Sequence, residues 1–298
     1  MCVECGDDER VTRRTFLTSA TAALAGVALG AEAAGQQPPR TRALDDPNII
    51  KETVTYQSGD KNIEGYLARP KKAGRYGAVI IAHGNPGVSE DIKNAAAQVA
   101  RAGFVGLVYD WGSSAPMPTE QKELEKWRDY IFRHEFIKRQ MRDVQAGIDY
   151  LQERAFVKRQ RVGMVGFCGG GRLALLFSQQ SKDVKAVVSF YGAVLYHQRK
   201  HGTDPVPDVM DVVKQIAVPV QGHYGALDVV APVVDAKLFE KELRAQGTPI
   251  EMYYYEGAGH SFYDFTRPQG SDTGFDYNPE ASALAHRRMI KFLKRHLS

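Results

Sequence analysis

Short apolar runs alternate with amphipathic stretches along most of the chain. Six runs of five or six residues are rich in β-branched or aromatic side chains, as is typical of strands covered on both faces of a sheet. These predicted strands span residues 78–82, 104–109, 161–166, 186–190, 218–223 and 250–255. Between them, apolar residues recur every three or four positions, which predicts helices. The predicted helices span residues 91–102, 140–153, 172–178, 231–246 and 282–297. This alternation predicts an α/β fold with a mostly parallel sheet and helices on both faces.

Two shorter segments precede this pattern. Residues 52–56 and 63–68 alternate between polar and apolar positions on either side of a turn at 59–62. They predict a β-hairpin that adds an antiparallel edge to the sheet. The chain has no internal repeat, so we predict one domain over residues 51–298.

Two stretches interrupt the alternation. Residues 111–136 are rich in Pro, Ser and charge and hold both tryptophans, and residues 195–214 contain Pro205 and Pro207. Both follow predicted strand ends, where open α/β sheets bind ligands. Each is either a lid over a binding site or a surface insertion, since loops of this length are often functional.

The first 35 residues differ in kind from the rest. Two arginines at positions 13 and 14 precede an uncharged stretch over 18–30, and residues 31–33 offer the small-x-small site that signal peptidase needs. The stretch is too short and too weakly apolar for a permanent membrane helix. We therefore predict a twin-arginine (Tat) leader over residues 1–35, a polar spacer over 36–50, and a periplasmic or secreted mature protein with no stable membrane insertion.

Composition and charge narrow the function classes. The chain has 298 residues and 43% apolar composition, which is enough for one core without disulfides or a structural metal. The formal charge is +4 and no basic run is interleaved with aromatic residues, so nothing favours a nucleic-acid partner. Cys2 and Cys5 lie in the predicted leader. Cys168 is therefore a lone thiol in the mature chain, without a disulfide partner.

The strongest chemical motif is the run Gly-Phe-Cys-Gly-Gly at residues 166–170. It follows a predicted strand and precedes a predicted helix, which is the context of the nucleophile elbow, here with cysteine in place of serine. The alternative is a Gly-rich turn with a buried cysteine. A phosphate-binding loop would end in Gly-Lys-Ser/Thr, which is missing. Because the positive end of a helix favours thiolate, Cys168 is the candidate nucleophile.

An elbow requires an acid and then a histidine further along the chain. Asp228 follows the predicted strand 218–223, and His260 follows the strand 250–255 and precedes the last helix. We expect His260 to accept the thiol proton, or to pair with the thiolate as an imidazolium. We expect Asp228 to fix the tautomer of that histidine.

Two backbone N–H groups should form the oxyanion hole. Gly169 directly follows the nucleophile and provides one. The loop after the strand 78–82 has the sequence His-Gly-Asn-Pro-Gly. Since Pro86 has no N–H, we predict Asn85 as the second donor, with Gly84 as the next choice. Without the elbow, this loop would be interpreted as an ordinary Pro-Gly turn.

A zinc site is the alternative interpretation of three other histidines. His197 and His201 are four residues apart, and His223 lies on a predicted strand. Cationic residues separate the first two, and Gly202 and Pro205 argue against a helix there. We therefore predict no metal site.

These motifs resemble the dienelactone hydrolase family of the α/β-hydrolase fold. The run Gly-Phe-Cys-Gly-Gly-Gly from Gly166, Asp228, and the run Gly-Ala-Gly-His-Ser-Phe around His260 carry the resemblance, which extends from the hairpin to the C-terminus. It implies hydrolysis of strained lactones and small esters through a cysteinyl acyl-enzyme, without a metal or an organic cofactor. By resemblance, Cys168, Asp228 and His260 are the nucleophile, acid and base.

Two positions depart from that family. Members often have His-Glu-Asn-x-Gly after the first core strand, and the Glu contacts the resting thiol. Gly84 occupies this position here. Members that act on dienelactone place an Arg four residues after the catalytic histidine to bind the substrate carboxylate. Here that residue is Asp264, with Arg267 three positions further on, so an anionic dienelactone is not the expected substrate.

The sequence thus predicts a periplasmic esterase or lactonase that works by acyl transfer to Cys168. The alternative is an α/β-hydrolase fold that binds a ligand or partner without turnover, and the missing Glu is its only support. The natural substrate and the oligomeric state stay open at this point.

Overall fold

The computed structural model describes residues 42–298, with the exception of residues 86, 117, 121, 124, 125, 128, 129, 131, 132, 196–207 and 271–273. The predicted leader over residues 1–35 lies outside the described residues, as do His197 and His201 of the zinc alternative.

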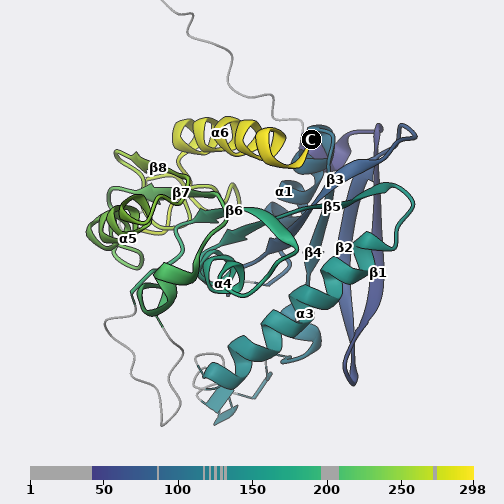
Figure 1. Ribbon diagram of the computed structural model, residues 1–298, viewed down its shortest axis with the longest axis horizontal. Helices are drawn as coiled ribbons and strands as arrows, with labels where there is room; N and C mark the ends of the chain where they lie inside the picture. The colour runs from purple at the N-terminus through teal and green to yellow at the C-terminus, as the bar shows by residue number, and fades with distance from the viewer. Residues whose placement is uncertain are drawn as a thin grey trace, which may run out of the picture. The chain divides into compact units, whose positions relative to one another are not determined.

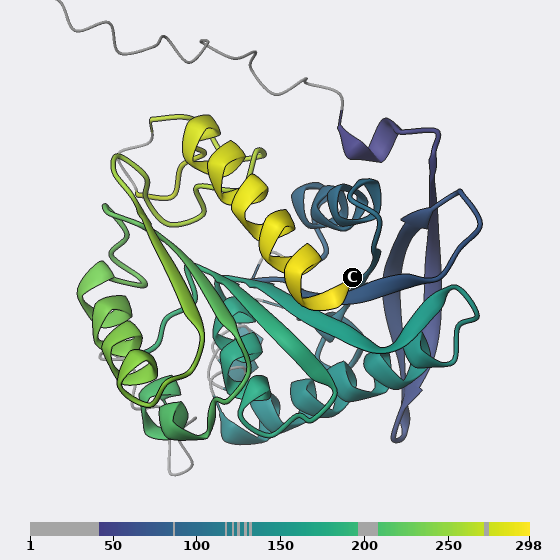
Figure 2. The ribbon, with the colours of Figure 1, turned by 45° about the horizontal axis from the view of Figure 1, so that its top comes forward.

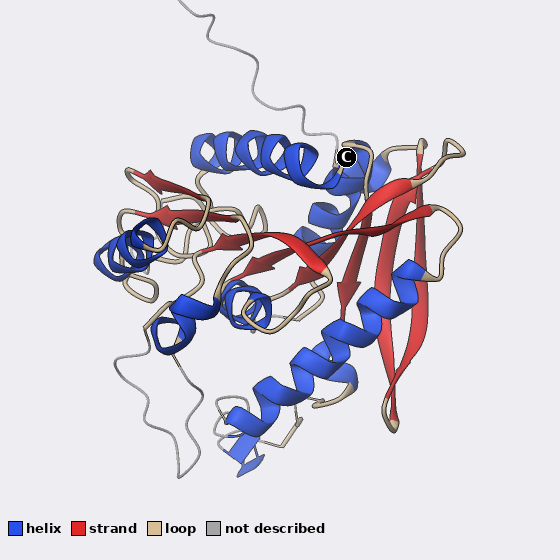
Figure 3. Ribbon diagram, in the orientation of Figure 1, coloured by secondary structure: helices blue, strands red, loops and turns tan. Residues whose placement is uncertain are grey.

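One eight-stranded sheet organises the described chain, in the order β1-β2-β4-β3-β5-β6-β7-β8 (Figures 1 and 3). The strands are β1 (Ile49–Ser58), β2 (Lys61–Pro70), β3 (Tyr76–Ala82), β4 (Val105–Tyr109), β5 (Val157–Phe167), β6 (Val184–Phe190), β7 (Val220–Gly225) and β8 (Ile250–Tyr255). β1 and β2 form an antiparallel hairpin, and β2 is antiparallel to β4. The other pairs, from β4 to β8, are parallel. The predicted α/β fold with an antiparallel edge is confirmed.

Helices cover both faces of this sheet. They are α1 (Glu90–Arg101), α3 (His134–Gln152), α4 (Gly169–Ser178), α5 (Val233–Ala245) and α6 (Pro279–Leu297). α1 and α6 lie on one face, and α3, α4 and α5 lie on the other (Figure 2). Each face buries its own apolar cluster, which is why the central strands are apolar on both sides. None of the described helices is both long and apolar enough to cross a membrane.

The folded chain starts earlier than residue 51. A short 3-10 helix, η1 (Ala43–Asp45), precedes β1, and β1 itself begins at Ile49. Ala43 is completely buried, and its N–H donates a hydrogen bond to Asn94 Oδ1 at 2.9 Å. The end of the predicted spacer therefore belongs to the fold. One buried alanine among polar residues gives no periodic pattern, so the sequence could not place this start.

The two interrupting stretches contain ordered structure that pattern analysis did not predict. α3 begins at His134, so the end of the first stretch is helical. The Trp111 ring stacks on the rings of His83 and Trp127, with centroids 5.3 and 5.7 Å away. The second stretch ends in the 3-10 helix η3 (Val209–Gln215). The first stretch is thus anchored beside the loop that follows β3.

Candidate active site

The Gly-rich segment around Cys168 forms a tight turn between a strand and a helix. Cys168 lies between β5 and α4 with φ 54° and ψ −119°, a left-handed conformation that is strained for a residue with a side chain. A Cβ at Gly166 would lie 2.0 Å from the Gly170 carbonyl oxygen, and one at Gly170 would lie 2.1 Å from the Ala82 carbonyl oxygen. Only glycine fits either position. The Cys168 N–H donates to the Phe190 carbonyl at 3.0 Å, which ties the elbow to β6.

A continuous hydrogen-bond chain joins the three predicted residues. His260 Nε2 lies 3.1 Å from Cys168 Sγ, and His260 Nδ1 lies 2.8 Å from Asp228 Oδ2. The other oxygen of Asp228 accepts hydrogen bonds from the N–H groups of Val230 and Ala231, both at 2.8 Å. The loop after β7 therefore fixes the carboxylate, and the carboxylate fixes the plane of the imidazole.

Burial and neighbouring charges shift the pKa values of Cys168 and His260 in opposite directions. His260 is 1% exposed and Asp228 is 5% exposed. Burial opposes ionisation of the thiol, but the charge of His260 and its hydrogen bond hold the pKa of Cys168 below its ordinary value. Burial also opposes protonation of the imidazole, but the neighbouring Cys168 and Asp228 raise the pKa of His260 to about 10. Both shifts favour a thiolate–imidazolium pair at neutral pH.

The loop after β3 lies directly against Cys168. A Cβ at Gly84 would be 2.9 Å from the Cys168 Cβ, so there is no room for a side chain without a shift. A Cβ at Gly169 would be 3.8 Å from Asn85 Oδ1, which places the two predicted oxyanion residues on facing segments. The Gly169 N–H also helps to lower the pKa of Cys168 through a hydrogen bond.

Comparison with known proteins decides the family. The sequence model of the dienelactone hydrolase family matches residues 63–297. The chain belongs to the dienelactone hydrolase family. A Bradyrhizobium sp. protein assigned as a 2-oxo-3-(5-oxofuran-2-ylidene)propanoate lactonase is 32% identical over 237 residues, which cover 78% of this chain and 89% of that protein. A Synechocystis sp. protein assigned as a carboxymethylenebutenolidase is 29% identical over 258 residues, 83% of this chain and 98% of that one.

Solved structures agree on the fold. A Klebsiella pneumoniae protein assigned as a dienelactone hydrolase superposes with a TM-score of 0.73 at 23% identity. The alignment covers 83% of this chain and 99% of that one. The chain therefore has the α/β fold of dienelactone hydrolases from β1 to α6.

Two acidic side chains, Asp264 and Asp91, lie near Tyr191, whose ring contacts His260. Asp264 is 8% exposed and accepts hydrogen bonds from the N–H and the hydroxyl of Thr266, at 2.9 and 2.6 Å. Its other oxygen pairs with Arg267 Nε at 3.2 Å, so this arginine is engaged by the carboxylate. Burial and the charge of Asp264 raise the pKa of nearby Asp91, against a hydrogen bond from Ser89 that lowers it. The predicted departure at position 264 is thus a buried carboxylate.

Two residues beside His260 were missed at the sequence level. The Tyr191 ring lies 4.9 Å from the imidazole, and the Phe275 ring lies 5.2 Å from it in a T-shaped contact. Tyr191 has φ 40° and directly follows β6. Its position at the carboxyl end of a predicted strand was a usable signal. Phe275 lies between β8 and α6 in a segment without periodic pattern, so no signal marked it.

His223 is a structural residue of the sheet. Its Nδ1 bonds the Tyr255 hydroxyl at 2.7 Å and its Nε2 bonds Gln221 Oε1 at 2.9 Å, so both ring nitrogens are occupied. Burial and the charge of Arg288 lower its pKa to about 3. Across the described residues, no three His, Cys, Asp or Glu side chains converge as a metal ion would require.

Proposed function

We propose that this hydrolase cleaves an uncharged lactone or small carboxylic ester through a thioester acyl-enzyme on Cys168. The observation that carries the proposal is the hydrogen-bond chain from Cys168 Sγ through His260 to Asp228. A thiolate paired with an imidazolium is ready to attack a carbonyl carbon, and the imidazolium is ready to protonate the leaving group.

In the acylation step, Cys168 Sγ attacks the carbonyl carbon and the C=O electron pair moves to oxygen. The backbone N–H groups of Gly169 and Asn85 are the proposed donors to this oxyanion. When the tetrahedral intermediate collapses, the C–O bond to the leaving group breaks and His260 gives its proton to the departing oxygen. With a lactone substrate, the resulting alcohol stays attached to the acyl chain.

Water completes the reaction. His260, now neutral, takes a proton from a water molecule while the water oxygen attacks the thioester carbonyl. The second intermediate releases the carboxylic acid and restores the thiolate beside the imidazolium. Asp228 stays ionised throughout and stabilises the positive imidazole.

The charge around the site supports an uncharged substrate. The lactone named for the Bradyrhizobium relative is a propanoate, and it carries a carboxylate. This chain has buried Asp264 near Tyr191, which contacts His260, and Arg267 is paired with Asp264. A substrate carboxylate would meet like charge there, which disfavours binding.

Steady-state kinetics test this proposal. We expect p-nitrophenyl acetate to be hydrolysed by the wild type, and the activity to be lost in Cys168→Ala. A neutral γ-lactone should be turned over with a kcat/KM at least tenfold above that of the same lactone bearing a carboxylate. An unchanged rate in Cys168→Ala would show that the thiol is not the nucleophile. An inactive wild type that still binds the lactone would favour the ligand-binding alternative.

We also propose export by the Tat pathway, supported by the paired arginines at positions 13 and 14 ahead of an uncharged stretch. Changing both to lysine should keep the protein in the cytoplasm with its leader uncleaved. Cell fractionation with an immunoblot measures this. Mature protein in the periplasm of the double variant would contradict the proposal.

A further inference from the structure

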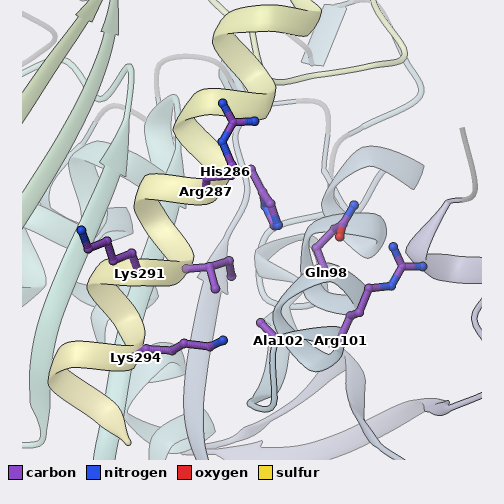
Figure 4. A pocket seen from close by; sticks show the side chains of 8 residues that line it. Gln98, Arg101, Ala102, His286, Arg287, Lys291 and Lys294 are labelled. Carbon is purple, nitrogen blue, oxygen red and sulfur yellow. The ribbon is translucent and has the colours of Figure 1, made fainter. Parts of the chain in front are cut away.

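A groove of about 410 Å³ lies between α1 and α6, on the face of the sheet that these two helices cover (Figure 4). Its lining residues are Gln98, Arg101, Ala102, His286, Arg287, Ile290, Lys291 and Lys294. The apolar members are Ala102 and Ile290, and the others are Gln98, His286 and four Lys or Arg side chains. Among the described residues, no carboxylate and no residue of the proposed triad lines this groove.

The three α6 cations that line the groove have no partner among the described residues. Arg287, Lys291 and Lys294 are exposed and make no ion pair or hydrogen bond with any described residue. Other arginines are paired: Arg295 with Glu251, and Arg101 of this groove with Asp46 at 3.0 Å. All three residues line the groove. In Figure 4 the Lys294 side chain extends from α6 towards α1, whereas that of Lys291 extends away from it.

His286 lies near two cations of the groove, Arg101 and Arg287. Figure 4 shows its ring between α6 and α1. Its Nδ1 shares a hydrogen bond of 2.9 Å with the Tyr263 hydroxyl, which fixes the ring. Burial, together with the charges of Arg101 and Arg287, lowers its pKa to about 4. Burial disfavours charge of either sign, so only the part of the shift that comes from Arg101 and Arg287 indicates a positive potential beside the ring, and that potential favours an anion.

We propose that this groove binds a small soluble polyanion with at least two phosphate groups. Arg287 and Lys294 are seven residues apart on one helix, so their Cα atoms are separated by about 10 Å along the axis. Two phosphate groups on one ligand can each reach one of these cations. Arginine and lysine recognise phosphate oxygens through charge-assisted hydrogen bonds.

A free ligand fits better than a phosphate-bearing membrane surface. The large apolar side chains that are exposed among the described residues are Leu227, Val229, Val230, Val234 and Leu238. All of them lie on α5 or on the loop before it, away from α1 and α6. Insertion into a membrane surface uses exposed large apolar side chains next to the basic ones, and the described residues of α1 and α6 include no exposed large apolar side chain.

Isothermal titration of the full chain with sodium tripolyphosphate tests the proposal. The titration should be run at an ionic strength of about 0.15 M, where attraction between distant surface charges is largely screened. We expect saturable binding to one site. Arg287→Ala combined with Lys294→Ala should weaken the affinity at least tenfold.

The matched control is Lys158→Ala combined with Lys241→Ala. Both lysines are exposed and lie on other elements, and this variant removes the same net charge. It should bind tripolyphosphate within twofold of the wild type. Equal weakening in both variants, or no saturation at millimolar ligand, would overturn the proposal, because the attraction would then be diffuse.

A second readout locates the ligand. NMR of protein with isotope-labelled histidines provides this readout, and the ring resonance of His286 is assigned by its loss in His286→Gln. It should shift on adding tripolyphosphate, while the ring resonance of His223 should not. Binding of the protein to vesicles that contain anionic lipid is the last measurement. Binding to vesicles without any binding of tripolyphosphate would contradict a soluble ligand.

Discussion

His260 and His223 are both buried, yet their surroundings shift their pKa values in opposite directions. His223 lies inside the sheet with neutral hydrogen-bond partners, and burial together with the charge of Arg288 lowers its pKa to about 3. His260 lies at the carboxyl end of the sheet, and there Cys168 and Asp228 raise its pKa to about 10 against the same effect of burial. A buried histidine with uncharged hydrogen-bond partners and a cation nearby is therefore neutral. Ionisable partners on both ring nitrogens are what make it a candidate base and acid.

The strongest test of this contrast removes the thiolate. Cys168→Ser should lower kcat/KM for p-nitrophenyl acetate by on the order of 10⁴-fold, because a serine hydroxyl does not ionise near pH 7 and His260 loses its charged partner. Initial rates measure this, and Cys168→Ala gives the background rate without the thiol. A serine variant within tenfold of the wild type would mean that the thiolate contributes little.

Removing the charge of the acid should have the next largest effect. Asp228→Asn keeps an oxygen for the N–H groups of Val230 and Ala231, but its amide favours the wrong tautomer of His260. We expect kcat to fall by roughly 10³-fold with the fold intact. Circular dichroism serves as the control for folding. Near-normal turnover would show that a different carboxylate orients His260.

His223→Gln should affect stability instead of catalysis. Losing one of the two buried hydrogen bonds should lower the free energy of unfolding by about 1–3 kcal/mol, while kcat changes less than threefold. Urea unfolding and initial rates measure the two effects. A large loss of kcat in a folded variant would make His223 part of the catalytic machinery.

The same histidine makes stability depend on pH. The pKa of His223 is about 3 in the fold and about 6.5 in an unfolded chain. The unfolded state therefore binds the extra proton between these values, and stability falls as pH is lowered from 6.5 towards 3. His223→Gln should reduce this slope by up to about 1.4 kcal/mol per pH unit. Identical slopes in the two proteins would contradict a neutral buried His223.

The sequence was sufficient to predict the parts of the fold that depend on neighbouring residues along the chain. The apolar runs predicted the parallel strands, and the elbow motif placed Cys168 between β5 and α4, because strand burial and turn geometry depend on neighbouring residues. Asp228 and His260 each follow the end of a parallel strand, so they were expected to lie at the same edge of the sheet.

Features set by long-range packing could not be predicted in this way. Ala43 is buried only because α1 lies beside it, and Phe275 meets His260 through a segment without periodicity. The groove between α1 and α6 depends on how two helices, nearly 200 residues apart in the sequence, lie together. None of these follows from spacing along the chain.

The pH dependence of thiol alkylation tests the central claim most directly. In the full chain with Cys2→Ser and Cys5→Ser, iodoacetamide labels Cys168 alone. Because the pKa of Cys168 is lowered and that of His260 is raised, thiolate persists at low pH, and we predict a labelling midpoint well below the ordinary cysteine pKa of about 8.5. His260→Ala should move that midpoint up to the ordinary value or beyond it. A wild-type midpoint at or above 8.5 would contradict the resting ion pair, and His260 would then act as a general base on a neutral thiol.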